Sequence, residues 1–190
     1  MYQMHSSMAI RMLITIATAA ALRPLIIFGR PGAGKSTIAE RLVAHPEANA
    51  YNLDLDVCVP QRMRDNFAQG IYPTLAERQA FASDAASYVV TASADKKAAC
   101  CVVSFSFVND DLRDSFRARF PEATWALVDA SDALAGERIA SRDGHFYDPP
   151  PAKGDEWLFA PVEFDHLVLD AMQPVEENVA KLLPLVRRPS

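Results

Sequence analysis

Cysteine is scarce in this chain, and there is no excess of positive charge. The three cysteines, Cys58, Cys100 and Cys101, follow no metal-binding spacing, and the adjacent pair lies in an apolar run. We therefore expect free, buried thiols in a protein of a reducing compartment. The net charge is −5 and the sequence pI is about 5.3, which argues against a broad basic face for nucleic acid but permits a local basic cleft.

The chain also lacks internal repeats, low-complexity segments and a membrane-spanning run. The apolar stretch from Met12 to Leu22 is too short to cross a bilayer, so no membrane partner is expected. No acidic residue precedes Glu40, and a targeting segment is one interpretation of this region. We favour an N-terminal extension (1–23) packed on a single domain (24–190) of a cytoplasmic protein, and an organellar targeting segment stays open.

One stretch, PLIIFGRPGAGKST from Pro24 to Thr37, carries a complete phosphate-binding loop pattern. An apolar strand precedes the loop and a helix-compatible run follows it, so backbone N–H groups and the helix N-terminus would surround phosphate oxygens. We expect Lys35 to reach the β- and γ-phosphates of ATP and Ser36 to ligate Mg²⁺. The predicted nucleotide-binding residues of this loop are Gly29, Arg30, Pro31, Gly32, Ala33, Gly34, Lys35, Ser36 and Thr37.

Apolar runs alternate with helical patterns along the rest of the chain, which is typical of βαβ units and a parallel sheet. The expected strands are Leu25 to Phe28, Ala50 to Leu53, Ala99 to Phe105, Thr124 to Val128 and His166 to Leu169. The expected helices are Lys35 to His45, Gln61 to Gln69, Thr74 to Ala94, Asp110 to Arg119, Ser131 to Ser141 and Val175 to Leu185. The pattern predicts an α/β protein with a three-layer P-loop nucleoside-triphosphate kinase fold, in which helices cover both faces of a five-stranded parallel sheet and residues 142–158 form a lid.

Two carboxylates, Asp54 and Asp56, close the second strand, where ligands gather in such a fold. They are candidates for positioning Mg²⁺ and for accepting a proton from a substrate hydroxyl. Arg138 and Arg142 lead into the lid, and an arginine supplied by a closing loop stabilises charge on a transferring phosphoryl group. The chain has no Asn-Lys-x-Asp run and no apolar strand ending in Asp-Glu. These absences argue against guanine-specific switch proteins and many motor ATPases and favour a small-molecule kinase.

The residues resemble the gluconokinase family, relatives of the shikimate kinases, over most of the chain. The matching pieces are Asp54-Leu55-Asp56 with Pro60, Gly70 with Arg78, Ser104-Phe105-Ser106 with Arg113-Asp114, Arg138 and Arg142 with Gly144-His145-Phe146, and Asp170 with Gln173-Pro174-Val175-Glu176. The resemblance implies that Asp56 is the catalytic base, that Asp54 and Ser36 serve Mg²⁺, and that Arg142 and Lys35 act on the phosphates. It places Arg138, Gln173 and Pro174 near adenine, and Arg78, Arg113 and His145 on the acceptor side.

The sequence departs from this family on the acceptor side. Val59, Met63, Asn66 and Asn109 stand where the family has His, Asn, Lys and Lys. A site that pairs a polyol and its carboxylate would lose affinity without those groups. The residues for phosphoryl transfer are therefore retained, whereas the residues that would bind the acceptor differ, which indicates a different acceptor.

We expect an ATP- and Mg²⁺-dependent kinase acting on a hydroxyl of a small metabolite, with a sugar acid such as gluconate as the first candidate. Arg62, Arg64 and Arg78 keep a nucleoside monophosphate kinase as an alternative. An ATP-binding regulatory protein without an acceptor is the third possibility. The resemblance suggests a homodimer.

Overall fold

A computed structural model describes residues 22–96, 98, 100–141 and 158–187. Five parallel strands form one sheet in the order β2-β3-β1-β4-β5. Their bounds are β1 Leu25–Phe28, β2 Ala50–Asp54, β3 Cys100–Phe105, β4 Thr124–Asp129 and β5 Leu167–Asp170. The α/β prediction with a five-stranded parallel sheet is confirmed. Most of the N-terminal extension (1–21) and of the lid (142–157), with Arg142 and His145, lie outside the described residues.

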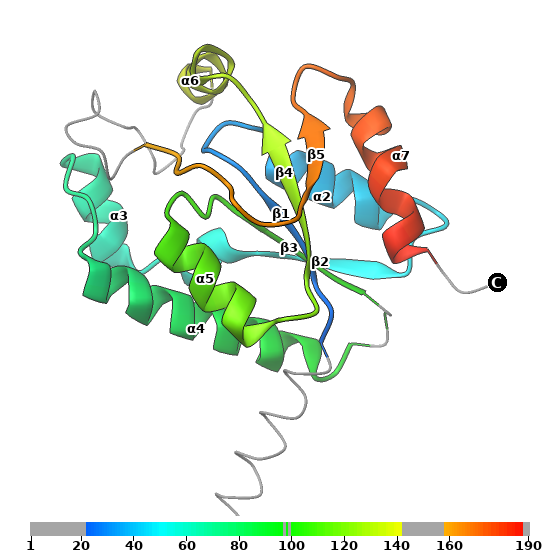
Figure 1. The fold of residues 1–190 in the computed structure, drawn as a ribbon, viewed down its shortest axis with the longest axis horizontal. Helices are drawn as coiled ribbons and strands as arrows, with labels where there is room; N and C mark the ends of the chain where they lie inside the picture. Colours follow the sequence, from blue (N-terminus) through cyan, green and yellow to red (C-terminus); the bar gives the residue numbers. More distant parts are fainter. Residues whose placement is uncertain (1–21, 97, 99, 142–157, 188–190) are drawn as a thin grey trace, which may run out of the picture.

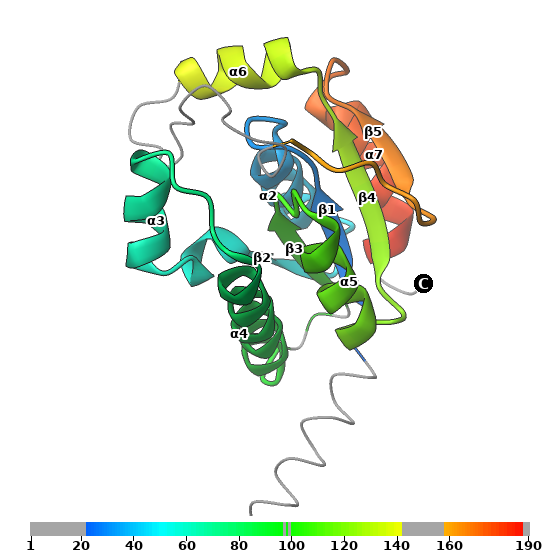
Figure 2. The same cartoon turned by 60° about the vertical axis from the view of Figure 1, so that its left-hand side comes forward.

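Helices cover both faces of the sheet, as Figures 1 and 2 show. The helices are α2 Lys35–Ala44, α3 Gln61–Ala68, α4 Leu75–Ser93, α5 Asp110–Arg119, α6 Asp132–Ala140 and α7 Val175–Val186, with a 3₁₀ turn η1 Leu55–Cys58 after β2. α4 and α5 pack together on one face, and α2 and α7 pack together on the other. α6 lies above the carboxyl end of β4, so it stands at the edge of the sheet where ligands of such folds bind.

The central strand β1 contributes to two hydrophobic cores. All four of its side chains are buried, and they alternate between the faces because successive strand residues point in opposite directions. Ile26 and Phe28 join the core under α4 and α5, whereas Leu25 and Ile27 join the core under α2 and α7. This burial on both sides fixes β1, and the loop that follows it starts from a rigid point.

Local capping signals in the sequence account for two helix starts. Thr74 and Glu77 form the expected capping box at the start of α4. Ser131 accepts the N–H of Leu134 and caps α6. No helix within the described residues is both long and apolar enough to cross a membrane.

The three cysteines are free thiols. Cys101 is buried beneath α4, and burial raises its pKa to about 11. Burial also raises the pKa of Cys100 and of Cys58. The expectation of free thiols is confirmed, but only Cys101 is buried, whereas Cys58 and Cys100 are half-buried. At neutral pH these groups are protonated and poorly nucleophilic.

Candidate active site

The phosphate-binding loop connects β1 to α2 in a conformation that requires glycine. Gly32 and Gly34 have φ of 80° and 100°, a region that side chains with a Cβ rarely adopt. A Cβ on Gly32 would also lie 2.4 Å from the carbonyl oxygen of Ala135 in α6. The Nζ of Lys35 donates a hydrogen bond of 2.9 Å to the carbonyl of Arg30 and so lies back along the loop. The loop therefore packs closely against α6, and Lys35 is the first residue of α2.

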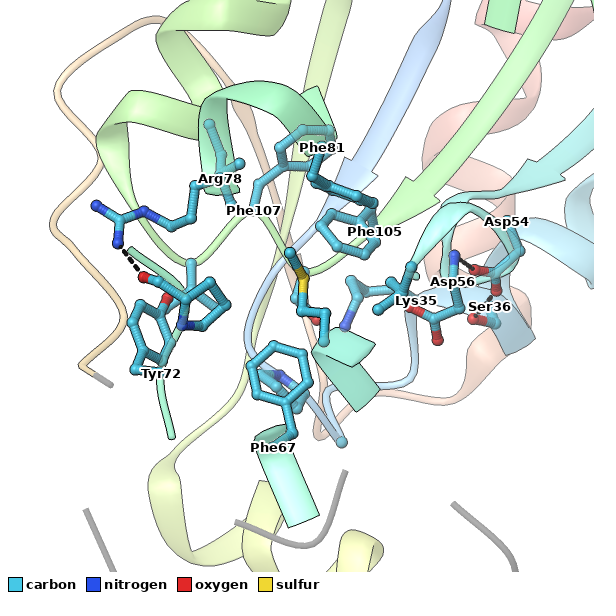
Figure 3. Close-up of a pocket in the computed structure, with 18 of the residues that line it drawn as sticks. Lys35, Ser36, Asp54, Asp56, Phe67, Tyr72, Arg78, Phe81, Phe105 and Phe107 are labelled. Carbon is cyan, nitrogen blue, oxygen red and sulfur yellow. Dashed lines mark hydrogen bonds between the residues drawn. The ribbon is translucent and has the colours of Figure 1, made fainter. Parts of the chain in front are cut away.

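Ser36, Asp54 and Asp56 meet beside this loop (Figure 3). The Oγ of Ser36 donates to Oδ2 of Asp54 at 2.6 Å, and Oδ1 of Asp54 accepts the N–H of Asp56 at 3.0 Å. Asp54 is the last residue of β2 and caps η1, so its carboxylate is held on both sides. Asp56 lies in the first turn of η1 and lines the same pocket as Lys35. Chain segments far apart in sequence thus bring two carboxylates to the phosphate loop.

The donor set around Ser36 suits a magnesium ion. Mg²⁺ is held in such sites by one or two carboxylates or hydroxyls together with substrate phosphates and water. The direct Ser36–Asp54 hydrogen bond shows that these two oxygens can approach one point. Within the described residues no cluster of three or more His, Cys, Asp or Glu side chains is present.

Replacing Asp54 with asparagine tests this assignment. The amide removes the negative charge while keeping the shape, so the Mg²⁺ concentration for half-maximal activity should rise by about 10- to 100-fold. Magnesium titrations of ATP turnover measure this shift. Asp114→Asn is the matched control, because Asp114 is exposed on α5, pairs with Arg117 and lies outside the pocket lining. An unchanged magnesium requirement in Asp54→Asn would remove Asp54 from the metal site.

One continuous pocket extends from the phosphate loop toward α3 and α4. Gly32, Lys35, Ser36, Asp54 and Asp56 line one end. The remainder is formed by residues of α3, α4 and α5, of the connections before and after α3, and of the end of β3 with the segment that follows it. These are Val59, Met63, Phe67, Tyr72, Pro73, Arg78, Phe81, Phe105, Ser106, Phe107, Val108 and Leu112.

The sequence did not reveal most of the aromatic residues in this pocket. Helical spacing placed Phe67 and Phe81 on helices but did not say which face turns inward. Phe105 lies within the Ser104-Phe105-Ser106 segment, and its position at the end of a strand is the only sequence feature that places it near the site. Tyr72 carried no signal at all.

The arginines near the acceptor side are engaged with the protein. Arg78 lines the far end of the pocket, donating to Asp111 at 2.8 Å and to the Pro73 carbonyl at 2.7 Å. Arg64 donates to the carbonyls of Val59 and Asp56. Arg62 is largely exposed and pairs with Glu77 at 3.1 Å. The structure therefore assembles no arginine cluster at the acceptor end among the described residues.

Arg113 does not face the acceptor as predicted. It is 1% exposed and lies outside the pocket lining. Its guanidinium donates to the carbonyls of Phe107, Val108 and Pro161 and pairs with Asp110. Burial lowers the pKa of Arg113, an effect opposed by Asp110. Arg113 therefore ties the pocket loop after β3 to the segment before β5 instead of binding substrate.

Because the Arg113 guanidinium is buried and hydrogen-bonded, its replacement should lower the stability of the protein. Lysine cannot reproduce the planar fork that reaches three carbonyls, so Arg113→Lys should lower the free energy of unfolding by about 2–4 kcal/mol. The melting temperature should fall by roughly 5–10 °C, as differential scanning calorimetry would measure. Arg117→Lys, one turn along α5 and exposed, is the control and should change stability by less than about 0.5 kcal/mol. Equal melting temperatures for the two variants would show that the Arg113 guanidinium does not stabilise the contact between the segment after β3 and the segment before β5.

A second cavity lies on the other side of the loop. Its lining residues are Ala33, Gly34, Thr37, Ile38, Arg138, Ala171, Gln173, Val175 and Asn178. Arg138 spans it, donating to the carbonyls of Ala33 and Ala171 at 2.9 Å each. Pro174 precedes α7 and caps its start. The predicted adenine-side residues thus come together, next to the loop and outside the first pocket.

Arg30 and Pro31 shape the rim of the loop. Arg30 forms an ion pair with Asp132 at the start of α6, and its guanidinium lies 5.7 Å from the ring centroid of Phe159. Pro31 lines the first pocket. Gly29 packs against β4, because a Cβ there would lie 2.6 Å from the carbonyl oxygen of Val128. The loop residues named from the sequence are therefore assembled around a single backbone turn.

Solved structures share this fold. A sugar kinase from Janibacter sp. HTCC2649 has a TM-score of 0.68 at 22% identity, covering 88% of this chain and 99% of that one. A gluconokinase from Sinorhizobium meliloti 1021 has a TM-score of 0.62 at 21% identity, covering 85% and 90%. A shikimate kinase from Acinetobacter baumannii, solved with shikimate, has a TM-score of 0.55 at 15% identity, covering 90% and 96%. The resemblance to gluconokinases and shikimate kinases is confirmed at the level of the fold.

The sequence itself was compared with curated proteins and with family models. The comparison with curated proteins found no significant match. The model of the AAA_33 family, described as an AAA domain, matches residues 25–158. This span begins at β1, contains the phosphate loop and both aspartates, and extends through α6. Because the match covers well over half of the sequence, the chain belongs to the AAA_33 family.

Proposed function

We propose that the protein is an ATP-dependent kinase that phosphorylates a hydroxyl group of a small metabolite. The observation that carries this proposal is one pocket that contains Lys35 and Ser36 of the phosphate loop together with Asp56. A nucleotide on the loop and an acceptor in the pocket would meet at these side chains. The fold shared with the sugar kinase and the shikimate kinase supports the same reaction class.

The reaction needs little covalent chemistry from the protein. The acceptor oxygen forms a bond to the γ-phosphorus of ATP while the bond from that phosphorus to the ADP oxygen breaks. Asp56 takes the hydroxyl proton, and Lys35 stabilises negative charge on the transferring group. Ser36 and Asp54 would hold Mg²⁺, which would neutralise phosphate charge. The products are a phosphate monoester, ADP and one proton.

Arg142 and Arg138 complete the proposed nucleotide side. Arg138 already borders the second cavity, where Thr37, Gln173 and the neighbouring Pro174 offer a surface for adenine. Arg142 follows α6 directly in sequence and would reach the phosphates from the lid, which would also exclude water and limit futile ATP hydrolysis. His145 of the same segment remains a proposed acceptor contact.

The acceptor class follows from the pocket rather than from the loop. Likeness to gluconokinases makes a sugar acid such as gluconate the first candidate, and Arg78 would have to leave Asp111 to contact its carboxylate. A nucleoside monophosphate kinase needs several arginines for the acceptor phosphate, whereas Arg62, Arg64 and Arg78 are each engaged with protein groups. A regulatory protein without an acceptor would not need the part of the pocket that extends from Asp56 toward α3 and α4.

A turnover assay tests the proposal. ADP release from ATP with Mg²⁺ would be followed with gluconate, shikimate, polyols, nucleoside monophosphates and ring-bearing alcohols. Stimulation by a compound whose only reactive group is a hydroxyl is the expected result. Stimulation by nucleoside monophosphates alone would move the protein to the nucleotide kinases. Binding of ATP with no stimulation by any acceptor would favour the regulatory alternative.

A further inference from the structure

The acceptor end of the pocket is lined mainly by apolar and aromatic side chains. Phe81 and Phe107 are buried, and Phe105, whose ring packs against both of theirs, is half-buried. The ring centroids of Phe81 and Phe105 are 4.9 Å apart, and those of Phe105 and Phe107 are 5.3 Å apart at 86°. Figure 3 shows these three rings together on one side of the cavity, with Phe67 projecting into it from α3 on the other. The space beyond Asp56 therefore lies between aromatic surfaces.

Aliphatic side chains close the gaps in this wall. Val59 follows η1, Met63 lies on α3, and Val108 and Leu112 come from the end of the β3 loop and from α5. Val59 and Leu112 are nearly inaccessible, so their side chains are fixed against the core. The flexible side chain of Met63 can adjust its conformation to a ring packed against it.

Among the described residues that line this end, the polar side chains are those of Tyr72, Arg78 and Ser106, and the first two already have protein partners. The hydroxyl of Tyr72 is hydrogen-bonded to the side chain of Asn109. The guanidinium of Arg78 is paired with Asp111 and the Pro73 carbonyl, so its charge is balanced within the protein. A compound with hydroxyls along its whole length would leave most of them facing hydrocarbon, which is costly.

From this lining we infer that the acceptor is an alcohol built on an apolar ring, with its hydroxyl at Asp56 and its ring between Phe67 and Phe105. The ring gains the stacking and edge contacts that aromatic walls offer. A polyhydroxylated sugar acid such as gluconate gains no comparable set of hydrogen bonds. The inference rests on the proposed function for the reaction, but the preference of the pocket for a ring can be measured by binding alone.

The experiment uses benzyl alcohol and cyclohexylmethanol as ring probes, with gluconate and glycerol as polar probes. Saturation-transfer NMR on the full-length protein loaded with ADP and Mg²⁺ reports binding, and ADP release in the presence of ATP reports turnover. Ring alcohols should show saturation transfer and compete with each other. They should also stimulate ATP turnover, with a KM at least about 10-fold below that of gluconate. Gluconate would bind more weakly because its hydroxyls would face apolar side chains without hydrogen-bond partners.

Met63 supplies a matched pair of variants. Met63→Gln keeps length but places an amide against the ring, so the KM and the dissociation constant for benzyl alcohol should rise by about 3- to 10-fold. Met63→Leu restores an apolar surface and should stay within about 2-fold of the wild type. Leu185→Gln, on an exposed position of α7, controls for a polar substitution on a helix and should change neither constant.

The two measurements separate this inference from the kinase proposal. Binding of ring alcohols that Met63→Gln weakens, without turnover, would support the apolar pocket and count against the kinase reaction. Gluconate binding more tightly than either ring alcohol, with no response to Met63→Gln, would overturn the inference while leaving a kinase. Absence of saturation transfer to both ring alcohols on protein that binds ADP would overturn it as well.

Discussion

Replacing Lys35 with alanine should reduce acceptor-dependent ATP turnover by at least about 1,000-fold. Lys35 opens α2, and its ammonium lies back along the phosphate loop, hydrogen-bonded to the carbonyl of Arg30. In the proposed reaction, Lys35 would stabilise charge from this position as the γ-phosphoryl group leaves ADP. The alanine variant keeps helix propensity, so the fold should persist while the rate collapses. Steady-state kinetics with a coupled ADP assay measures the effect.

Lys181→Ala is the control for Lys35. Lys181 is exposed on α7 and lines neither cavity, and its loss should leave kcat unchanged. Circular dichroism on both variants separates lost catalysis from lost structure. Turnover in Lys35→Ala within about 10-fold of the wild type would contradict the phosphate-loop chemistry proposed here.

Asp56→Asn should lower kcat by about 100- to 10,000-fold while ATP binding stays near normal. Asparagine has nearly the same shape but cannot accept the hydroxyl proton. The backbone N–H of residue 56 still reaches Oδ1 of Asp54, so the turn around η1 should be preserved. Single-turnover kinetics with saturating acceptor isolates this step, and nucleotide titration monitors binding.

An asparagine substitution at Asp65 controls for the loss of a carboxylate nearby. Asp65 is exposed on α3 and accepts a hydrogen bond from Gln61 at 2.8 Å. Its replacement should leave kcat within about 2-fold of the wild type. Wild-type turnover in Asp56→Asn would remove Asp56 from the mechanism, and it would shift attention to acceptors that need no base, such as phosphates.

The phosphate loop and its carboxylates could be predicted because their signals are local or follow from parallel topology. The glycine spacing defines the loop, and the buried run Leu25 to Phe28 defines the strand before it. Asp54 ends a strand, and the carboxyl ends of parallel strands share one edge of the sheet. The 2.6 Å contact between Ser36 and Asp54 is the outcome that this rule anticipates.

The acceptor side could not be predicted with the same precision. Helical spacing places Arg113 and Arg117 on one face of α5 but does not say how that face turns. In the structure Arg113 points into the protein and Arg117 remains partly exposed. The aromatic wall depends on Phe67, Phe81 and Phe105, which come from three elements, so only tertiary packing reveals that their rings share a cavity.

Identifying the phosphorylated product is the decisive test of whether this protein transfers phosphate to a hydroxyl. The protein would be incubated with ATP, Mg²⁺ and the acceptor panel, and the mixture followed by phosphorus NMR coupled to mass spectrometry. We expect a new phosphate monoester on an acceptor hydroxyl, formed in step with ADP, absent in Lys35→Ala and strongly slowed in Asp56→Asn. Formation of ADP and inorganic phosphate alone with every acceptor, or transfer to a phosphate instead of a hydroxyl, would contradict it.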